Sequence, residues 1–334
     1  MTAVTMNLQH LVDQAQSFPP IRVAVVDAAQ AVVIETLRQA HALGIIEPRL
    51  IGDPESIAAL CDSQAWKVKA DWIIPSSTDS ASAAKAVELA RTGQVDAVMK
   101  GNVHTDVLMH ALLDKTHGLR VPGRRVSHVF VVEVSTYPKL LGITDAAINI
   151  APDLNAKAQI LQNAVDLFKL LGIEKPKVAV LSAVESVNPE IASTLDAACL
   201  TLMAQRGQIV GATVDGPLAF DNAISRRAAD EKGIASSVAG DADILLVPDL
   251  IAGNILAKNL EYLANAVAAG AALGLAVPVV LTSRADPAPA RLASLALAAL
   301  MHHRTPKAAA KPRPSEPSVG CAPQAEHACC PLTG

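Results

Sequence analysis

The chain has 334 residues and a mass of 34.6 kDa, a length that suggests roughly two domains at about 150 residues each. A net charge of -4 and an aromatic content of only 2% argue against a basic nucleic-acid-binding surface with stacking platforms. Mean hydropathy is high, at +0.32, but the longest uncharged run, 263–282, is built from Ala and Gly and contains Pro278. We therefore predict no membrane span and no nucleic-acid partner.

Short apolar runs alternate with longer amphipathic runs along the chain, which is the pattern of βαβ units around a mostly parallel sheet. The runs that predict buried strands are Ile21–Val26, Trp72–Ile74, Ala97–Met99, Ser127–Val132, Lys177–Leu181, Ile209–Thr213, Ile244–Val247 and Val277–Leu281. Helices are predicted over Ala31–Leu43, Ser80–Thr92, Asn155–Leu171, Pro189–Gln205, Asp221–Glu231 and Asn254–Leu273. The pattern predicts an α/β fold.

The composition changes at the C-terminal end of this pattern. Residues 305–334 are rich in Pro, Ala and Ser without any period, so we predict a disordered tail. The first 30 residues show no signal-peptide pattern, and five cysteines at irregular spacing do not form a disulfide framework. These features predict a cytoplasmic protein with reduced thiols.

Polar residues follow several predicted strands, at the positions where open α/β sheets hold ligands. In the segment 100–106, KGNVHTD, Lys100 ends a strand, Gly101 permits a tight turn, and Thr105 or Asp106 begins a helix. Such a turn presents backbone N–H groups to an anion, although it can equally be an ordinary strand-to-helix connection. The segment 280–286, VLTSRAD, places a hydroxyl, a guanidinium and a carboxylate at one strand end, a set that can bind a tetrahedral anion and move a proton. Two further segments of this kind are 215–224 and 247–258.

At these segments the sequence resembles the phosphate acetyltransferase/phosphate butyryltransferase family, and it is most similar to the butyryltransferase branch. The resemblance extends over about residues 15–303. It rests on KGNVHTD (100–106), SHVFVVEV (127–134), ITDAAINIAPDL (143–154), KAQILQNAVDL (157–167), VDGPLAFDNAIS (214–225), VAGDADILLVPDLIAGNILAKNL (238–260) and PVVLTSRAD (278–286).

The resemblance implies reversible transfer of a short acyl group, acetyl or butyryl, between CoA and inorganic phosphate. It implies two α/β domains of isocitrate/isopropylmalate dehydrogenase-like architecture with the active site in the cleft between them, assembled as a homodimer or larger homo-oligomer. Domain 1 is then 1–149 plus 279–304, and domain 2 is the inserted segment 150–278. The family uses no metal and no permanently bound cofactor, since CoA and acyl-CoA are substrates.

By this resemblance Ser283 and Arg284 match the Ser-Arg pair of the family, with Arg284 on phosphate or the developing charge and Ser283 donating to the carbonyl or thiolate. Ser127 matches a family serine at the phosphate site, where Lys100 and Thr105 are also expected. Acetyltransferases place an Asp seven residues after the Ser, a position that here is Ala290. Asp286 is therefore a candidate general base, or else a turn residue ahead of Pro287.

For CoA we expect main-chain contacts near Gly253 and Asn254 and a basic contact from Lys258. The alternative interpretation of Lys258 is a solvated residue on the surface of a helix. Two other functions remain open. One is a metal-dependent decarboxylating dehydrogenase on a similar scaffold, for which Asp215, Asp221, Asp241, Asp243 and Asp249 are available as ligands. The other is a non-catalytic CoA-binding module.

Overall fold

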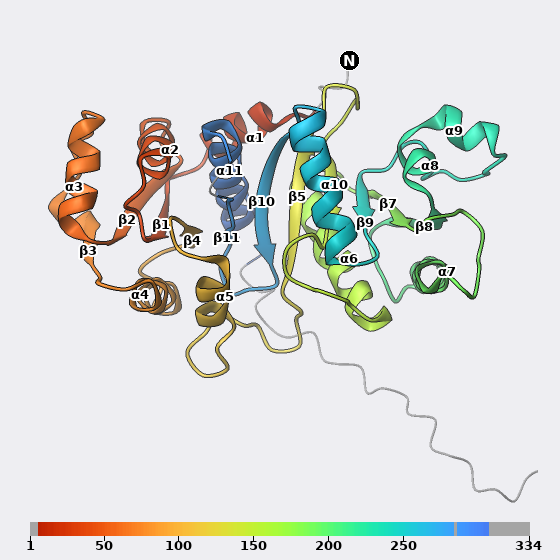
Figure 1. The fold of residues 1–334 in the computed structure, drawn as a ribbon, viewed down its shortest axis with the longest axis horizontal. Helices are drawn as coiled ribbons and strands as arrows, with labels where there is room; N and C mark the ends of the chain where they lie inside the picture. Colours follow the sequence, from red (N-terminus) through yellow and green to blue (C-terminus); the bar gives the residue numbers. More distant parts are fainter. Residues whose placement is uncertain (1–5, 284–285, 307–334) are drawn as a thin grey trace, which may run out of the picture.

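The computed structural model describes residues 6–283 and 286–306. In this part of the chain the strands form one eleven-stranded sheet with the order β3-β2-β1-β4-β11-β10-β5-β6-β9-β7-β8 (Figure 1). The strands are β1 (Ile21–Val26), β2 (Ile46–Gly52), β3 (Ile73–Pro75), β4 (Ala97–Lys100), β5 (Ser127–Glu133), β6 (Leu141–Thr144), β7 (Lys177–Leu181), β8 (Thr213–Leu218), β9 (Ile244–Leu246), β10 (Val267–Leu273) and β11 (Val279–Val280). Most neighbouring strands run parallel, which confirms the predicted α/β class.

Helices cover both faces of the sheet. They are α1 (Leu8–Ala15), α2 (Ala31–Ala42), α3 (Pro54–Ser63), α4 (Asp79–Arg91), α5 (Thr105–Leu113), α6 (Leu154–Leu170), α7 (Ala192–Gln205), α8 (Phe220–Ile224), α9 (Arg226–Glu231), α10 (Leu250–Leu263) and α11 (Ala288–Arg304), with a 3-10 turn, η1, at Ala70–Trp72.

The buried side chains divide into three apolar clusters according to the face of the sheet. Alternate residues of a strand point to opposite faces, so Val23 and Val25 of β1 join one cluster and Ala24 and Val26 join another. The first cluster collects α1, α2, α3, α6, α7 and α11 on one face. On the other face, α4 and α5 pack over one end of the sheet, and α8, α9 and α10 pack over the other, in two separate clusters.

The centre of the sheet corrects one prediction. The run 254–273, expected as a single Ala-rich helix, ends its helix at Leu263 and continues as β10, which is antiparallel to both β5 and β11. Alanine favours a helix intrinsically, but tertiary pairing overrides that preference here. Small residues fit this central strand because α11 packs directly against it.

Further differences concern the bounds of two elements and two strands that were not predicted. The strand predicted at 209–213 is wrong, because the strand instead begins at Thr213 and runs through Pro217 as the edge strand β8, where a missing N–H is tolerated. The helix predicted at 221–231 breaks at Ser225, whose hydroxyl caps α9 by accepting from the Ala228 N–H at 3.3 Å. Strands β2 and β6 were not predicted.

The division into domains 1–149 plus 279–304 and 150–278 stays a prediction. The predicted tail, from residue 307 onward, lies outside the described residues. In the described ranges no helix combines the length and apolar character needed to cross a membrane.

Candidate active site

The connection between β4 and α5 positions Lys100. Residues after β4 pass close beneath the end of β1: the Gly101 N–H donates to the Val26 carbonyl at 3.0 Å and the Asn102 N–H to the Asp27 carbonyl at 2.8 Å. A Cβ at Gly101 would collide with both of these carbonyl oxygens, so glycine is required by close approach. Lys100 is consequently buried, at 3% exposed, while Thr105 is an exposed residue at the start of α5.

The segment after β11 lies beside Lys100. Because β11 and β4 are parallel neighbours, both strands end at the same edge of the sheet. Lys100 Nζ donates to the Thr282 carbonyl at 3.3 Å, and Thr282 Oγ1 donates to the Lys100 carbonyl at the same distance. The predicted residues Lys100 and Ser283 are therefore brought together, and Ser283 is exposed. Arg284 lies outside the described residues.

Asp286 closes the turn after Ser283. Its Oδ2 accepts the Ser283 N–H at 2.7 Å, which is the turn role that the sequence left open. Burial raises the pKa of the Asp286 carboxyl, against the opposing charges of Arg291, Lys258 and Lys100. A carboxyl with a raised pKa is suited to accept a proton near neutral pH, so the turn role and a base role are compatible.

Helix α10 carries two charged residues that influence Asp286 electrostatically. The charge of Lys258 lowers the pKa of Asp286, whereas burial and the charge of Asp286 raise the pKa of Glu261. Lys258 and Glu261 of α10 therefore interact electrostatically with Asp286. Lys258 is exposed.

Gly253 has a different role from the one expected. The helix does not open at Gly253–Asn254: it begins at Leu250, and Asp249 caps it by accepting the Ala252 N–H at 2.9 Å. The Gly253 N–H is occupied within the helix, donating to the Asp249 carbonyl at 3.1 Å. A Cβ on Gly253 would lie 2.9 Å from the Asp145 carbonyl oxygen, so this glycine lets α10 pack on the loop after β6.

The ITDAAIN segment owes its form to a buried carboxylate. Asp145, at 3% exposed, accepts hydrogen bonds from the N–H groups of Ala147, Ile148 and His128 at 3.0 to 3.1 Å, and from Asn149 Nδ2 at 2.6 Å. Asn254 reaches the same loop through the Ala146 carbonyl, at 3.4 Å. The motif thus forms the loop that follows β6, and the start of α10 packs against this loop.

His128 of β5 is fully buried between this loop and the central strand β10. Both of its ring nitrogens lack a hydrogen-bond partner, and its ring packs edge-on against Phe130 with centroids 4.4 Å apart. Burial lowers the pKa of the imidazole to about 4, although the Asp145 carboxylate opposes that change. His128 is therefore neutral at physiological pH.

Ser127, the residue before it, points to the opposite face of the sheet. It is fully buried, and its Oγ accepts from Asn163 Nδ2 of α6 at 2.9 Å. The structure thus does not bring the Ser127 hydroxyl to the group formed by Lys100, Ser283 and Asp286. Its contact with phosphate stays a prediction that this burial does not favour.

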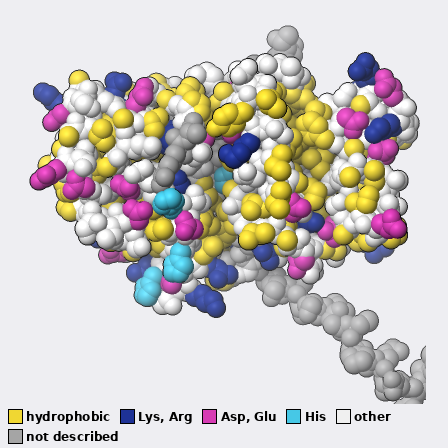
Figure 2. Space-filling view, in the orientation of Figure 1, with side chains coloured by type: hydrophobic (Ala, Val, Ile, Leu, Met, Phe, Trp, Pro, Cys, Tyr) yellow, Lys and Arg dark blue, Asp and Glu magenta, His cyan; other side chains and the backbone are white. Residues whose placement is uncertain are grey.

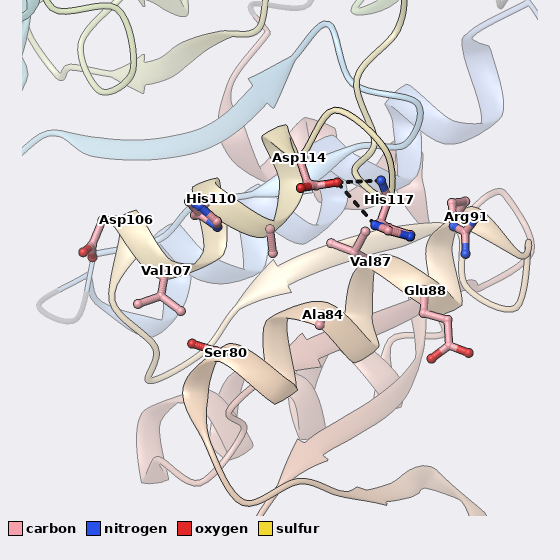
Figure 3. A pocket seen from close by; sticks show the side chains of 11 residues that line it. Ser80, Ala84, Val87, Glu88, Arg91, Asp106, Val107, His110, Asp114 and His117 are labelled. Atoms are coloured by element: carbon pink, nitrogen blue, oxygen red, sulfur yellow. Dashed lines mark hydrogen bonds and ion pairs between the residues drawn. The ribbon is translucent and has the colours of Figure 1, made fainter.

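A cavity of about 720 Å³ lies elsewhere, between α4 and α5 (Figure 3). Its floor is apolar, with Val87 and Val107 among the lining residues, and His110, Asp114 and His117 lie along one side. Asp114 accepts the His117 N–H at 2.6 Å, and backbone hydrogen bonds hold the pKa of that carboxyl below its usual value. Of the candidate segment 100–106, Asp106 lines this cavity, whereas Lys100 and Thr105 do not. Among the residues that the structure describes, no group of three or more His, Cys, Asp or Glu is placed to hold a metal ion.

Sequence reasoning missed Arg291, in the first turns of α11. It is 1% exposed and donates from Nε to the Asp286 carbonyl at 3.1 Å, from Nη1 to Thr282 Oγ1 at 3.2 Å, and from Nη2 to the Ser283 carbonyl at 2.8 Å. The one signal in the sequence that could have found it is its position as a single arginine inside an otherwise apolar helical run.

Comparison with known proteins identifies the family of the chain. The family model described as phosphate acetyl/butaryl transferase matches residues 76–299. A phosphate acetyltransferase of Rickettsia felis is 48% identical over 89% of this chain and 86% of its own length, and a phosphate butyryltransferase of Clostridium acetobutylicum is 44% identical over 84% and 93%. The crystal structure of a branched-chain phosphotransacylase from Enterococcus faecalis V583 superposes with a TM-score of 0.73 at 33% identity, covering 85% of this chain and 99% of that one. The chain belongs to the phosphate acetyl/butyryltransferase family.

Proposed function

We propose that this chain is an acyltransferase that moves a short acyl group, acetyl or butyryl, reversibly between CoA and inorganic phosphate. The observation that carries the proposal is the group formed where β4 and β11 end: a buried ammonium at Lys100, an exposed hydroxyl at Ser283, and a carboxyl at Asp286 whose pKa is raised. Relatives named phosphate acetyltransferase and relatives named phosphate butyryltransferase both match most of the chain.

The group fits each step of the chemistry. A phosphate oxygen attacks the thioester carbonyl, the carbon–sulfur bond breaks, and hydrogen phosphate plus acyl-CoA gives acyl phosphate plus CoA thiol. The proton leaves the phosphate and ends on the thiolate sulfur, and Asp286 relays it. Ser283 donates to the carbonyl oxygen or the thiolate, and the Lys100 charge attracts the anionic phosphate. Arg284 is assigned to phosphate by family resemblance alone.

A cleft between α5 and α10 would hold both substrates. Two observations support it: the apolar clusters beneath α5 and beneath α10 are separate, and Lys258 of α10 is within electrostatic reach of Asp286. In this proposal it is the interdomain cleft that the family resemblance implies, between two domains of dehydrogenase-like architecture. Fixing both reactants in one cleft supplies the positioning contribution to catalysis.

CoA binds as a substrate, with no permanently bound cofactor. Lys258 is the contact for its phosphates, with Thr105 and Asn254 at the two sides of the cleft. The Gly253 main chain is not included, because its N–H is used within α10. We expect the protein to act in the cytoplasm.

We also propose assembly as a homodimer or larger homo-oligomer. Four side chains of α10 support an intermolecular contact, since Ile251, Ile255, Tyr262 and Leu263 are between 55% and 81% exposed. Figure 2 shows hydrophobic side chains gathered over the part of the surface that α10 occupies in Figure 1. Sedimentation of the full chain tests this proposal, and a monomer at micromolar concentration contradicts it.

The test of function is release of CoA thiol from acetyl-, propionyl- and butyryl-CoA, with and without phosphate. We expect phosphate-dependent release, and a loss of at least 100-fold in kcat for Asp286→Asn, in the range of general-base contributions. Asp62→Asn, an exposed position on α3, is the matched control and should retain wild-type rates.

The pH profile gives a second reading. A base acts when deprotonated, so the rate should fall as pH decreases through the pKa of Asp286, and this fall should occur at a higher pH than for an ordinary aspartate. Absence of thiol release with every acyl-CoA refutes the proposal. Turnover that requires added metal and NAD(P) would instead favour the decarboxylating dehydrogenase, and CoA binding without turnover would favour the non-catalytic module.

A further inference from the structure

We propose that Arg291 is a positioning residue whose buried guanidinium fixes the backbone on which Ser283 and Asp286 stand. This inference rests on the proposed function only for its kinetic consequence. Its structural content is independent of the reaction.

The first argument is the hydrogen-bond geometry. The guanidinium contacts both ends of the segment: Thr282 Oγ1 at 3.2 Å and the Ser283 carbonyl at 2.8 Å before the turn, and the Asp286 carbonyl at 3.1 Å after it. An arginine presents its donors in a rigid planar fork, so three acceptors on one short segment are held in fixed relative positions.

The second argument is burial. Arg291 is the largest side chain in the described residues that is almost fully buried, with 1% of its surface exposed. Removing a guanidinium from water is costly unless its donors are satisfied, so the fold tolerates the charge at this position only together with these contacts. Thr282, Ser283 and Asp286 supply hydroxyl and backbone oxygens to it, and the Asp286 charge adds a favourable electrostatic interaction.

The third argument is that the segment is held from its other side as well. Lys100 Nζ donates to the Thr282 carbonyl at 3.3 Å, and Thr282 Oγ1 returns a hydrogen bond to the Lys100 carbonyl. The end of β11 is thus fixed between β4 and α11, and Arg291 determines where the chain leaves it. A displacement of about 1 Å at a reacting group can reduce turnover about 100-fold.

The kinetic test compares Arg291→Met, Arg291→Lys and a matched control, Arg304→Met. Arg304 lies at the end of the same helix and also donates to a backbone carbonyl, that of Leu170 at 2.9 Å, but it does not contact the Ser283–Asp286 segment. We expect Arg291→Met to lower kcat about 100-fold, with KM for acyl-CoA and phosphate within about threefold of wild type. Arg291→Lys should have a kcat at least tenfold higher than that of Arg291→Met, because the lysine ammonium keeps the positive charge and can donate to some of the three oxygens that Arg291 contacts. Arg304→Met should leave kcat unchanged.

The pH profile adds a measurement that a purely structural role would not alter. Removing the Arg291 charge removes one of the influences that lower the pKa of Asp286, so the acid limb of the rate should move to higher pH in Arg291→Met and less in Arg291→Lys. If the methionine variant does not fold, Arg291→Gln replaces it. A kcat within threefold of wild type, or a lysine variant no better than methionine, overturns the inference.

Hydrogen–deuterium exchange of the full chain separates this inference from the proposed function. The Ser283 N–H, which donates to Asp286, should exchange at least tenfold faster in Arg291→Lys than in wild type, and Arg304→Met should leave its exchange unchanged. Unchanged exchange in Arg291→Lys contradicts the positioning role whatever reaction the wild-type protein catalyses. Faster exchange in Arg291→Lys, together with a wild-type protein that releases no thiol from any acyl-CoA, would support the positioning role and refute only the proposed function.

Discussion

The buried histidine of β5 makes a quantitative prediction about acid stability. His128 has a pKa of about 4 in the folded protein, against 6.5 for the exposed group in an unfolded chain. Because the folded pKa is the lower one, the unfolded state takes up the proton first as pH falls below 6.5. The stabilisation due to a neutral His128 is therefore present above pH 6.5 and lost as pH falls toward 4.

The magnitude follows from the pKa difference at about 1.4 kcal/mol per unit. Between pH 7 and pH 4.5, protonation of His128 in the unfolded chain should lower the free energy of unfolding by about 2 kcal/mol. Replacing it by leucine, His128→Leu, keeps a similar volume beside Phe130 but has no titrating group. We expect the variant to lie within about 1.5 kcal/mol of wild type at pH 7, as volume-conserving core substitutions do.

Urea unfolding at several pH values between 7 and 4.5 measures both quantities. The wild-type free energy should fall more steeply than that of His128→Leu, with a difference of about 2 kcal/mol accumulating over the range. His104→Leu, at an exposed histidine before α5, is the control and should parallel wild type. Parallel curves for wild type and His128→Leu would show that the imidazole does not resist protonation in the folded state, and the reasoning would fail.

Three further substitutions test packing and polar contacts by their effect on thermal or urea unfolding. Gly253→Ala should lower stability by about 1–3 kcal/mol, because the added Cβ meets the Asp145 carbonyl at 2.9 Å, and an unchanged melting temperature would show that α10 shifts freely. Lys157→Met removes the partner of Asp196, whose Oδ2 lies 2.6 Å from the ammonium; a loss of about 1–3 kcal/mol is expected, and no loss would mark the pair as dispensable. Tyr137→Phe deletes a 2.6 Å hydrogen bond to the Ala242 carbonyl and should lower the free energy of unfolding by about 1 kcal/mol. An unfolding free energy equal to or above that of wild type would contradict this expectation.

Much of the fold follows from sequence periodicity. Strands β1 and β7 begin and end where their apolar runs do, and helices α2, α4 and α6 lie within a residue or so of the predicted bounds. Prediction failed where pairing across the sheet decides the conformation. The alanines of β10 favour a helix, but two neighbouring strands and α11 enclose them in the centre of the sheet.

The candidate site shows the same division. Lys100, Ser283 and Asp286 could be named as candidates because strand ends carry ligand sites in parallel sheets, a rule that needs only the order of the elements. The Gly253 contact was misread because the helix start was placed four residues late, at Asn254 rather than Leu250. Arg291 was missed because nothing in one sequence shows that a helical arginine turns inward toward the preceding loop.

The antiparallel centre of the sheet has a consequence for how the chain assembles during synthesis. Strand β5 pairs with β10 along its whole length, from Ser127 opposite Leu273 to Glu133 opposite Val267, and β4 pairs with β11 only at residues 279–280. Until the ribosome has delivered these late strands, the facing edges of β4 and β5 stay open, and unpaired edges of this kind promote aggregation. Such long-range pairing also slows folding. We therefore expect nascent chains ending before residue 267 to bind chaperones and longer chains to be released from them.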